Sequence, residues 1–257
     1  MKLRTCFLFT SILVLVAGTA AAQGPSKIGS CQTITQPGSY VVTKNLVAVG
    51  DCLVLKANYV SLDLGGFVIT GDGTGSGITS PQAVKGLVIH DGTIINFDSG
   101  IRFCEGPSTF DSAENVTVLR MQIYGNVGLG LRICGKGAIV KDTNASGNGE
   151  FGILIDGERS VISGNVANGN SSYGIFLGPI LGGSSVIGNT ADNNNSGGFV
   201  VGPGTTFMNN TARENGHAGL VVTCPSNVLG NTLTGNGLVN IQPVGAGCLI
   251  DHDVIAP

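Results

Sequence analysis

Apolar residues recur along this chain in pairs separated by one residue, and each pair directly follows a recurring glycine. The pairs are Ile101/Phe103, Leu131/Ile133, Ile153/Ile155, Ile175/Leu177, Phe199/Val201 and Leu220/Val222. Period-two spacing places both members of a pair on one face of a β-strand. Two more apolar columns lie twelve and seven residues before the glycine, at Val140, Ile162, Val186, Phe207, Val228 and at Ala145, Ala167, Ala191, Ala212, Leu233. Helical spacing is absent, so the pattern predicts three short strands per repeat, joined by Gly/Asn/Ser turns.

An asparagine stands four residues before each repeated glycine. The asparagines are Asn96, Asn126, Asn148, Asn170, Asn194, Asn215 and Asn236, and the glycines are Gly100, Gly130, Gly152, Gly174, Gly198 and Gly219, with Asn240 in the last copy. Asparagine tolerates the left-handed backbone of a sharp corner, and its amide can both donate and accept hydrogen bonds along a stack. These residues are therefore expected to form an asparagine ladder. A second column lies nine residues before the glycine, at Asn165, Asn189, Asn210 and Asn231, with Asp91 and Thr143 in that place earlier in the chain.

A period near 22 residues is typical of a solenoid, in which each coil buries its core against its neighbours. The prediction is an all-β, single-stranded parallel β-helix of about eight coils. Residues 1–22 have the basic start, apolar run and small-residue end of a signal peptide. We expect an N-terminal cap segment over 23–70, repeats over 71–250 and a C-terminal tail over 251–257.

Charge limits the partners that such a protein can have. Without Lys2 and Arg4 of the leader, 11 basic and 16 acidic residues remain, a net charge of −5. This balance argues against nucleic acid or an anionic membrane as the main partner. The leader's apolar run is too short to cross a membrane, and no later stretch is long enough, so we expect export without a transmembrane segment. The final compartment, periplasmic or extracellular, stays open.

Six cysteines remain after export, an even number that suggests disulfides. Cys104 and Cys134 both lie four residues after a repeat glycine in consecutive copies. Strands of a sheet lie roughly 4.8 Å apart, within reach of a disulfide. The expected pairs are Cys31–Cys52, Cys104–Cys134 and Cys224–Cys248.

Repeats such as "VISGNVANGNSSYGIFL", and the opening "CQTITQPGSY…VSLDLGGFVITG", resemble secreted bacterial β-helix proteins of the pectate-lyase-like superfamily. The resemblance covers roughly residues 28–250 and implies a right-handed β-helix. Members include polysaccharide lyases, hydrolases and epimerases, and also proteins without known chemistry. The Asp-Pro-His-Glu motif of alginate epimerases, the polygalacturonase set and the Arg-x-Pro-x-x-Arg run of pectate lyases are missing here.

The candidate site lies in the column two residues after the repeat glycine, which alternation directs outward. Arg102 and Arg132 occupy it in adjacent coils, and Asp156 lies close by in the next coil. Paired arginines can grip a carboxylate or sulfate of an acidic sugar, with Asp98, Glu150 or Asp156 as acid, base or partner. The alternative is that both arginines pair with carboxylates on a solvated face.

The same column continues as an outward apolar stripe, at Leu154, Phe176, Val200 and Val221. An exposed stripe suggests self-association or a covering loop, and the alternative is that the register buries it. Without tryptophan and with four tyrosines, the chain shows no aromatic platform for sugars.

No metal or cofactor site stands out. Ca²⁺ at the turn Asp72–Gly77 is conceivable, but the turn offers too few carboxylates. The neighbours His90 and Asp91 are weak candidates for catalysis, because Asp91 falls in the second turn column, and 251–253 reads as a polar tail.

Three functions remain open from the sequence. The first is a non-catalytic or unassigned extracellular module that binds acidic polysaccharide. The second is a polysaccharide lyase or epimerase acting on uronate polymers. The third is a purely structural solenoid at the cell surface.

Overall fold

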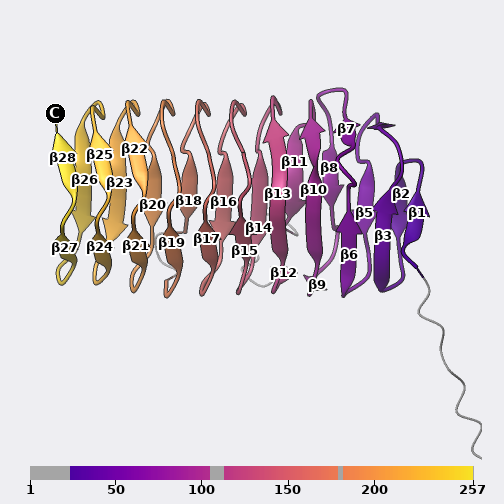
Figure 1. Cartoon of the computed structure of the whole chain (residues 1–257), viewed down its shortest axis with the longest axis horizontal. Helices are drawn as coiled ribbons and strands as arrows, with labels where there is room; N and C mark the ends of the chain where they lie inside the picture. The colour runs from indigo at the N-terminus through magenta and orange to yellow at the C-terminus, as the bar shows by residue number, and fades with distance from the viewer. Residues whose placement is uncertain (1–23, 105–112, 179–181, 257) are drawn as a thin grey trace, which may run out of the picture.

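The strands of this protein stack along one long axis, as the computed structural model shows for residues 24–104, 113–178 and 182–256 (Figure 1). All strand pairs among these residues are parallel, and the described chain forms strands and turns without a helix. No described helix is therefore long and apolar enough to span a membrane. The predicted signal peptide lies outside the described residues.

Thirteen strands form the larger sheet. Its main path is β1 (Ser26–Ile28), β3 (Gly38–Val42), β6 (Val60–Asp63), β10 (Val88–Ile95), β13 (Thr117–Tyr124), β15 (Ile139–Lys141), β17 (Val161–Ser163), β19 (Ser185–Ile187), β21 (Thr206–Met208), β24 (Asn227–Leu229) and β27 (Leu249–Asp251), with β4 (Leu46–Val47) and β7 (Val68–Thr70) beside it.

Ten strands form the second sheet, one from each coil. They are β2 (Gln32–Ile34), β5 (Leu53–Leu55), β8 (Ser76–Thr79), β11 (Ser99–Phe103), β14 (Leu131–Cys134), β16 (Ile153–Asp156), β18 (Ile175–Leu177), β20 (Phe199–Val201), β23 (Ala218–Thr223) and β26 (Val239–Val244). Smaller sheets join β22 (Thr211–Arg213), β25 (Thr232–Thr234) and β28 (Val254–Ala256), and β9 (Val84–Lys85) with β12 (Ala113–Glu114). The solenoid therefore has about ten coils rather than the expected eight.

The two extra coils come from the N-terminal segment, and the C-terminal residues complete the last coil. The segment 23–70, expected as a cap, contains β1 to β7, which pair within the two large sheets. The stretch 251–257, expected as a tail, contains β28 and the end of β27, which pair with β25 and β24. The weak repeat signal in these segments hid the fact that their strands follow the same register.

The core is built from the predicted apolar columns. Ile101, Ile153 and Leu220 are fully buried, and so are Val140 and its equivalents in the other sheet. The repeat glycine is explained by close stacking: a Cβ on Gly152 would lie 2.6 Å from the carbonyl oxygen of Ala145 and 2.7 Å from that of Gly174. Any side chain at this place would push the coils apart.

Asparagines, most of them buried, are joined by hydrogen bonds at one corner of successive coils from Asn126 onward. Each side-chain amide donates to the side-chain oxygen of the next member at 2.7–3.2 Å, in the order Asn126, Asn148, Asn170, Asn194, Asn215, Asn236 and Asn240. Asn96 lies outside this row. It occupies an exposed left-handed corner, and the backbone N–H of the next residue, Phe97, donates to Asn126 instead. Phe97 occupies the ladder position of this coil, three residues before its glycine rather than four. Counting four residues back from Gly100 therefore reached Asn96 instead.

The second column forms a similar row, from Thr143 through Asn165, Asn189 and Asn210 to Asn231. It ends on Asp253, whose Oδ1 accepts from the backbone N–H and the side chain of Asn231 at 2.6 and 2.8 Å. The supposed polar tail therefore holds the final member of a buried row.

The three predicted disulfides are confirmed. Cys31–Cys52, Cys104–Cys134 and Cys224–Cys248 have Cα–Cα separations of 4.5, 4.9 and 5.0 Å. Each bridge links neighbouring coils, so the three bridges fasten the first coils, the middle and the last coil.

Candidate functional site

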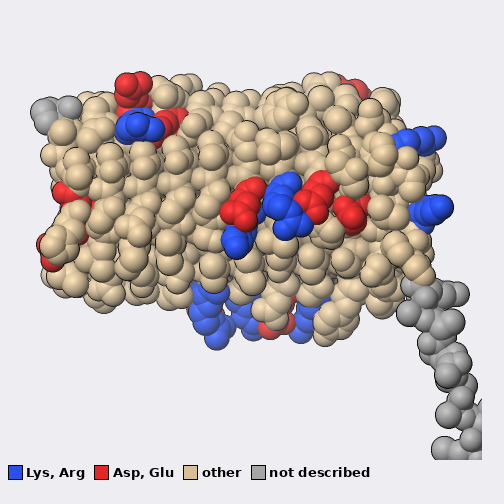
Figure 2. All heavy atoms as spheres, in the orientation of Figure 1, with Lys and Arg blue, Asp and Glu red and all other residues tan. Residues whose placement is uncertain are grey.

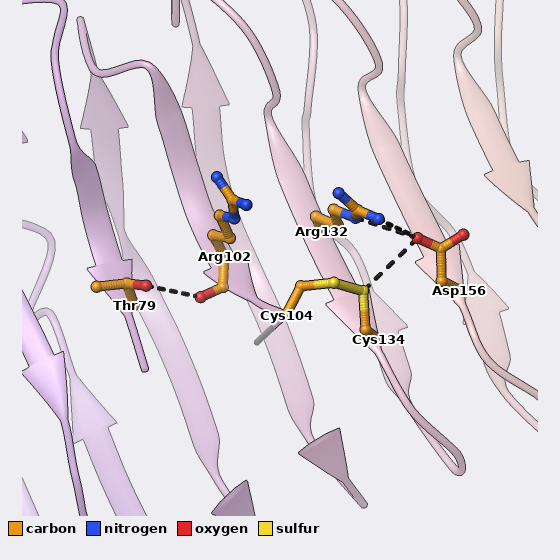
Figure 3. Close-up of a disulfide and its surroundings, with 6 residues drawn as sticks. All are labelled: Thr79, Arg102, Cys104, Arg132, Cys134 and Asp156. Atoms are coloured by element: carbon orange, nitrogen blue, oxygen red, sulfur yellow. Dashed lines mark hydrogen bonds and ion pairs between the residues drawn. A yellow bond between two sulfur atoms is a disulfide. The ribbon is translucent and has the colours of Figure 1, made fainter. Parts of the chain in front are cut away.

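Arg102 and Arg132 stand side by side on the outer face of the ten-stranded sheet. They are direct register partners of β11 and β14, and both side chains leave the same face (Figure 3). Their outward direction follows from alternation, because the flanking Ile101 and Phe103 fill the core. Both arginines are half-buried. The sequence thus placed the two guanidinium groups together correctly.

Asp156 binds Arg132. Nε and Nη2 of Arg132 donate to Oδ2 of Asp156 at 3.1 and 2.7 Å, and the side chains are only 23% and 21% exposed. Sγ of Cys134 lies 3.6 Å from the same oxygen, a van der Waals contact because a disulfide sulfur carries no hydrogen. Cys104, Cys134 and Asp156 are close enough for a metal site, but the disulfide consumes both thiolates. The carboxylate therefore orients Arg132 beside the disulfide (Figure 3).

Asp98 and Glu150 do not join this group. Both are exposed at the turn before the ten-stranded sheet. They lie two coils apart, with Gly128 of the intervening coil between them. Among the described residues, neither forms an ion pair with Arg102 or Arg132 within 4.0 Å. Asp156 is thus the only one of the three predicted carboxylates that the described structure places against an arginine.

An aromatic cluster beside the arginines was missed. Phe151 stacks with Tyr173 at 6.1 Å between ring centroids, and Phe176 meets their edges at 5.4 and 5.6 Å. All three rings are half-exposed. The signal was present in the sequence, because Phe151 and Tyr173 both directly precede a repeat glycine. A Cβ on Gly197 would lie 2.7 Å from the Tyr173 ring, so this ring lies over the bare backbone of the next coil.

The expected exposed apolar stripe is only partly open, because two of its four side chains are buried. Its register is as predicted, with Leu154, Phe176, Val200 and Val221 on successive strands. However, Leu154 and Val200 are only 7% and 5% exposed. Phe176 is covered in part by Phe151 and Tyr173. Phe176 and Val221 keep partly exposed side chains, so self-association through this stripe stays a hypothesis that rests on a smaller exposed surface than expected.

A second charged cluster crosses the thirteen-stranded sheet at the β10 and β13 corners, where Figure 2 shows red and blue spheres together. Arg120 donates through Nε and Nη2 to both carboxylate oxygens of Asp91 at 2.6 and 2.7 Å. The Arg120 guanidinium, with help from His90 Nδ1 at 2.8 Å, lowers the pKa of Asp91 to about 2.

Asp91 does not belong to the asparagine column, as the residue count had suggested. It aligns with Arg120 and Asp142 one place earlier, and all three have left-handed backbones with φ of 60°, 48° and 51°. Asp63, His90 and Asp91 are near enough to one another to hold a cation. Because Arg120 already engages both oxygens of Asp91, this donor set does not fit a metal ion.

The turn at Asp72 is a self-capped corner. Its Oδ1 accepts from the N–H and hydroxyl of Thr74 at 3.1 and 2.6 Å, and this hydroxyl lowers the pKa of Asp72. The carboxylate thus has a local role within its own turn.

A family profile described as "Right handed beta helix region" matches residues 100–254, more than half of the chain. The chain belongs to the right-handed β-helix family. Membership agrees with the repeat, the parallel stacking and the resemblance to pectate-lyase-like proteins. No protein of curated function matches the sequence.

Solved structures share the right-handed β-helix fold at low identity. The A-module of Azotobacter vinelandii mannuronan C-5 epimerase AlgE4 superposes with a TM-score of 0.69 and 18% identity over 86% of this chain and 68% of that one. The pectate lyase Pel9A gives 0.66 and 15%, covering 89% and 69%. The periplasmic alginate epimerase AlgG gives 0.55 and 12%, covering 86% and 69%. Sequence identities this low show only that the fold is shared.

Proposed function

We propose that this β-helix protein binds acidic polysaccharide across the outer face of its ten-stranded sheet. The observation that carries the proposal is the in-register pair Arg102 and Arg132 beside a half-exposed aromatic cluster. Strands lie roughly 4.8 Å apart, so the guanidinium groups can meet two acidic groups of one extended chain. Arginine binds carboxylate and sulfate through paired donors, which suits uronates and sulfated sugars.

The aromatic rings supply the second half of such a site. Register places Arg102, Arg132, Leu154 and Phe176 on four successive strands, a run of roughly 14 Å. A glycan lying along the solenoid would meet cations at one end of this run and ring faces at the other. Asp156 acts in this proposal by holding Arg132 in position.

The context of the chain supports a glycan partner. The structural neighbours carry names for activities on mannuronan, pectate and alginate, and one of them is periplasmic. Three disulfides suit an oxidising compartment, which supports export.

A lyase or epimerase is the second candidate, because a carboxylate lies next to an arginine on the same face. The reaction would require a base for the proton beside the uronate carboxylate. Asp156 could serve only if substrate drew Arg132 away from Oδ2. A purely structural solenoid predicts no glycan retention.

A glycan array with polygalacturonate and alginate tests the proposal, and absorbance of new unsaturated ends tests the lyase. We expect retention of an acidic glycan and roughly tenfold weaker binding of Arg132→Ala, which removes a charge-assisted contact. Arg213→Ala is the matched control, because Arg213 forms a similar pair with Asp192 elsewhere on the solenoid. No retention of any acidic glycan would refute binding, and unsaturated product lost in Arg132→Ala would favour the enzyme.

A further inference from the structure

A groove lined by basic side chains lies at the corner that follows the ten-stranded sheet, apart from Arg102 and Arg132. One hollow of about 400 Å³ is lined by Glu114, Asn115, Lys136, Gly137 and Arg159. An adjoining hollow of about 210 Å³ shares Glu114 and Lys136 and adds Lys85. β9 and β12 mark this edge in Figure 1, and Figure 2 shows blue spheres, with red ones among them, along the lower edge.

The cations of this groove have more donors than their partners use. Glu114 accepts from Lys85 Nζ at 2.9 Å and lies 3.6 Å from Lys136 Nζ, and the contact with Lys85 is the main reason that the pKa of Glu114 is lowered. Each ammonium has three N–H donors, so one carboxylate shared by two lysines leaves donors for a ligand. Arg159 Nη2 bonds the adjacent Glu158 at 2.6 Å, in a pair that is 64% and 47% exposed. Such an exposed pair holds its partners weakly.

The backbone at Arg159 is held in a conformation that favours glycine. The same corner is occupied in four other coils by a glycine with positive φ, namely Gly86, Gly137, Gly183 and Gly204, and in two others by Tyr59 and Asn115 with φ of 55° and 54°. Arg159 adopts a φ of 54° there, which costs an L-residue free energy that glycine avoids. The exposed ion pair between Arg159 and Glu158 contributes little stability to offset this cost. Backbone strain of this kind clusters at active sites and ligand-binding sites.

We propose that this groove binds an oxyanion, either a carboxylate or sulfate group of an acidic glycan or a free inorganic anion. Lys136 and Arg159 provide the charged donors on either side of Gly137, and the Asn115 amide can provide a neutral one. Gly137 keeps the floor open, because a Cβ there would lie 2.5 Å from Oδ1 of Asn115. The groove is a second site, independent of the sheet face.

The test is an NMR titration of the full mature chain with inorganic sulfate, oligogalacturonate and sulfated dextran, read at the backbone amides of Asn115 and Gly137. We expect saturable shifts at these amides. Arg159→Gly should weaken binding about fivefold while the melting temperature stays level or rises, because glycine relaxes the corner. Lys136→Gln should weaken binding similarly.

The matched control is Arg120→Gly, another arginine with positive φ, on the other sheet. It should leave the groove affinity unchanged, as should Arg132→Ala, so failure of the sheet-face site and failure of this groove are distinguishable. Saturation by sulfate alone supports a free anion, and saturation by the polymers alone supports a glycan group. The proposal is overturned if none of the three probes shifts these amides, or if Arg159→Gly binds as tightly as the native chain.

Discussion

The two halves of this solenoid share one core but differ in the polar residues around it. Residues 60–160 contain 18 Lys, Arg, Asp and Glu but only 5 Asn, whereas residues 161–240 contain 3 charged residues and 14 Asn. Arg102, Arg132, the groove around Lys136 and the Asp91–Arg120 pair lie in the first half. So do four of the five Lys, Arg, Asp and Glu residues with positive φ in the described chain, the fifth being Glu214. The second half has long buried asparagine rows and glycine corners instead.

The comparison teaches that scaffold and chemistry are separable in this protein. Ile101 in the charged half and Ile175 in the asparagine half are equally buried, at 0% exposure. Charged side chains lie at outward-facing strand positions or at corners, so the buried apolar residues of the strands are unaffected by them. A coil can therefore gain or lose a binding group without changing its core.

Replacing a buried ladder residue of the second half should have the largest effect. In Asn170→Ala, the backbone N–H of Asn148 would lose its acceptor at 3.0 Å, and the bonds to Ala145 and Asn194 would also be lost. A buried unsatisfied donor and several lost bonds should reduce the free energy of unfolding by about 2–4 kcal/mol. Urea denaturation measures this change.

The control is Asn144→Ala in the first half, where a half-exposed amide donates to Gln122 and accepts from the Ser146 hydroxyl. We expect a loss of about 1 kcal/mol or less. Equal losses in the two variants would show that the buried row is not what stabilises the second half.

Phe176→Ala tests the place where the halves meet, because its ring packs on Phe151 of one half and Tyr173 of the other. The ring is half-exposed, so we expect a loss of about 1–2 kcal/mol together with weaker glycan binding. Val221→Ala, in the same outward column, should leave glycan binding intact. Unchanged glycan affinity of Phe176→Ala would remove the aromatic cluster from the proposed site.

Acid should affect the charged half through Asp91. The pKa of this carboxyl falls from 3.8 to about 2 in the folded chain, so the ionised form is favoured by folding. The associated stability is complete above the unfolded pKa near 4 and is lost as pH falls toward 2. Because the side chain is 37% exposed, the effect should be about 1 kcal/mol or less. Denaturation of the native chain and Asp91→Asn between pH 5 and 2 measures it, and identical pH profiles would contradict the assignment.

Arg120→Gly should have the smallest effect, because two changes oppose each other. Glycine relieves the corner with φ of 48°, but the ion pair with Asp91 is lost. We expect the melting temperature to change by about 2 °C or less. A large drop would mean that the exposed charged cluster stabilises the first half more than its geometry suggests.

Much of the fold could be predicted from the sequence because a solenoid repeats its constraints. The glycine spacing placed Arg102 against Arg132 and Cys104 against Cys134, and the apolar pairs identified the core. Counting residues back from the repeat glycine gave the wrong position where a coil gained or lost a residue, as at Asn96 and Asp91. It also missed two coils in the N-terminal segment, and it missed that Asp253 continues a buried row at the other end without an asparagine to mark it.

The sequence by itself determined the solenoid, its inward columns, its disulfides and the paired arginines, because each depends on one register repeated coil after coil. Only the tertiary structure decided which outward residues touch. It brought Asp156 to Arg132, gathered Phe151, Tyr173 and Phe176, joined Arg120 to Asp91 and formed the groove around Glu114. Such contacts depend on side-chain directions and corner conformations in different coils, which no spacing along the chain specifies.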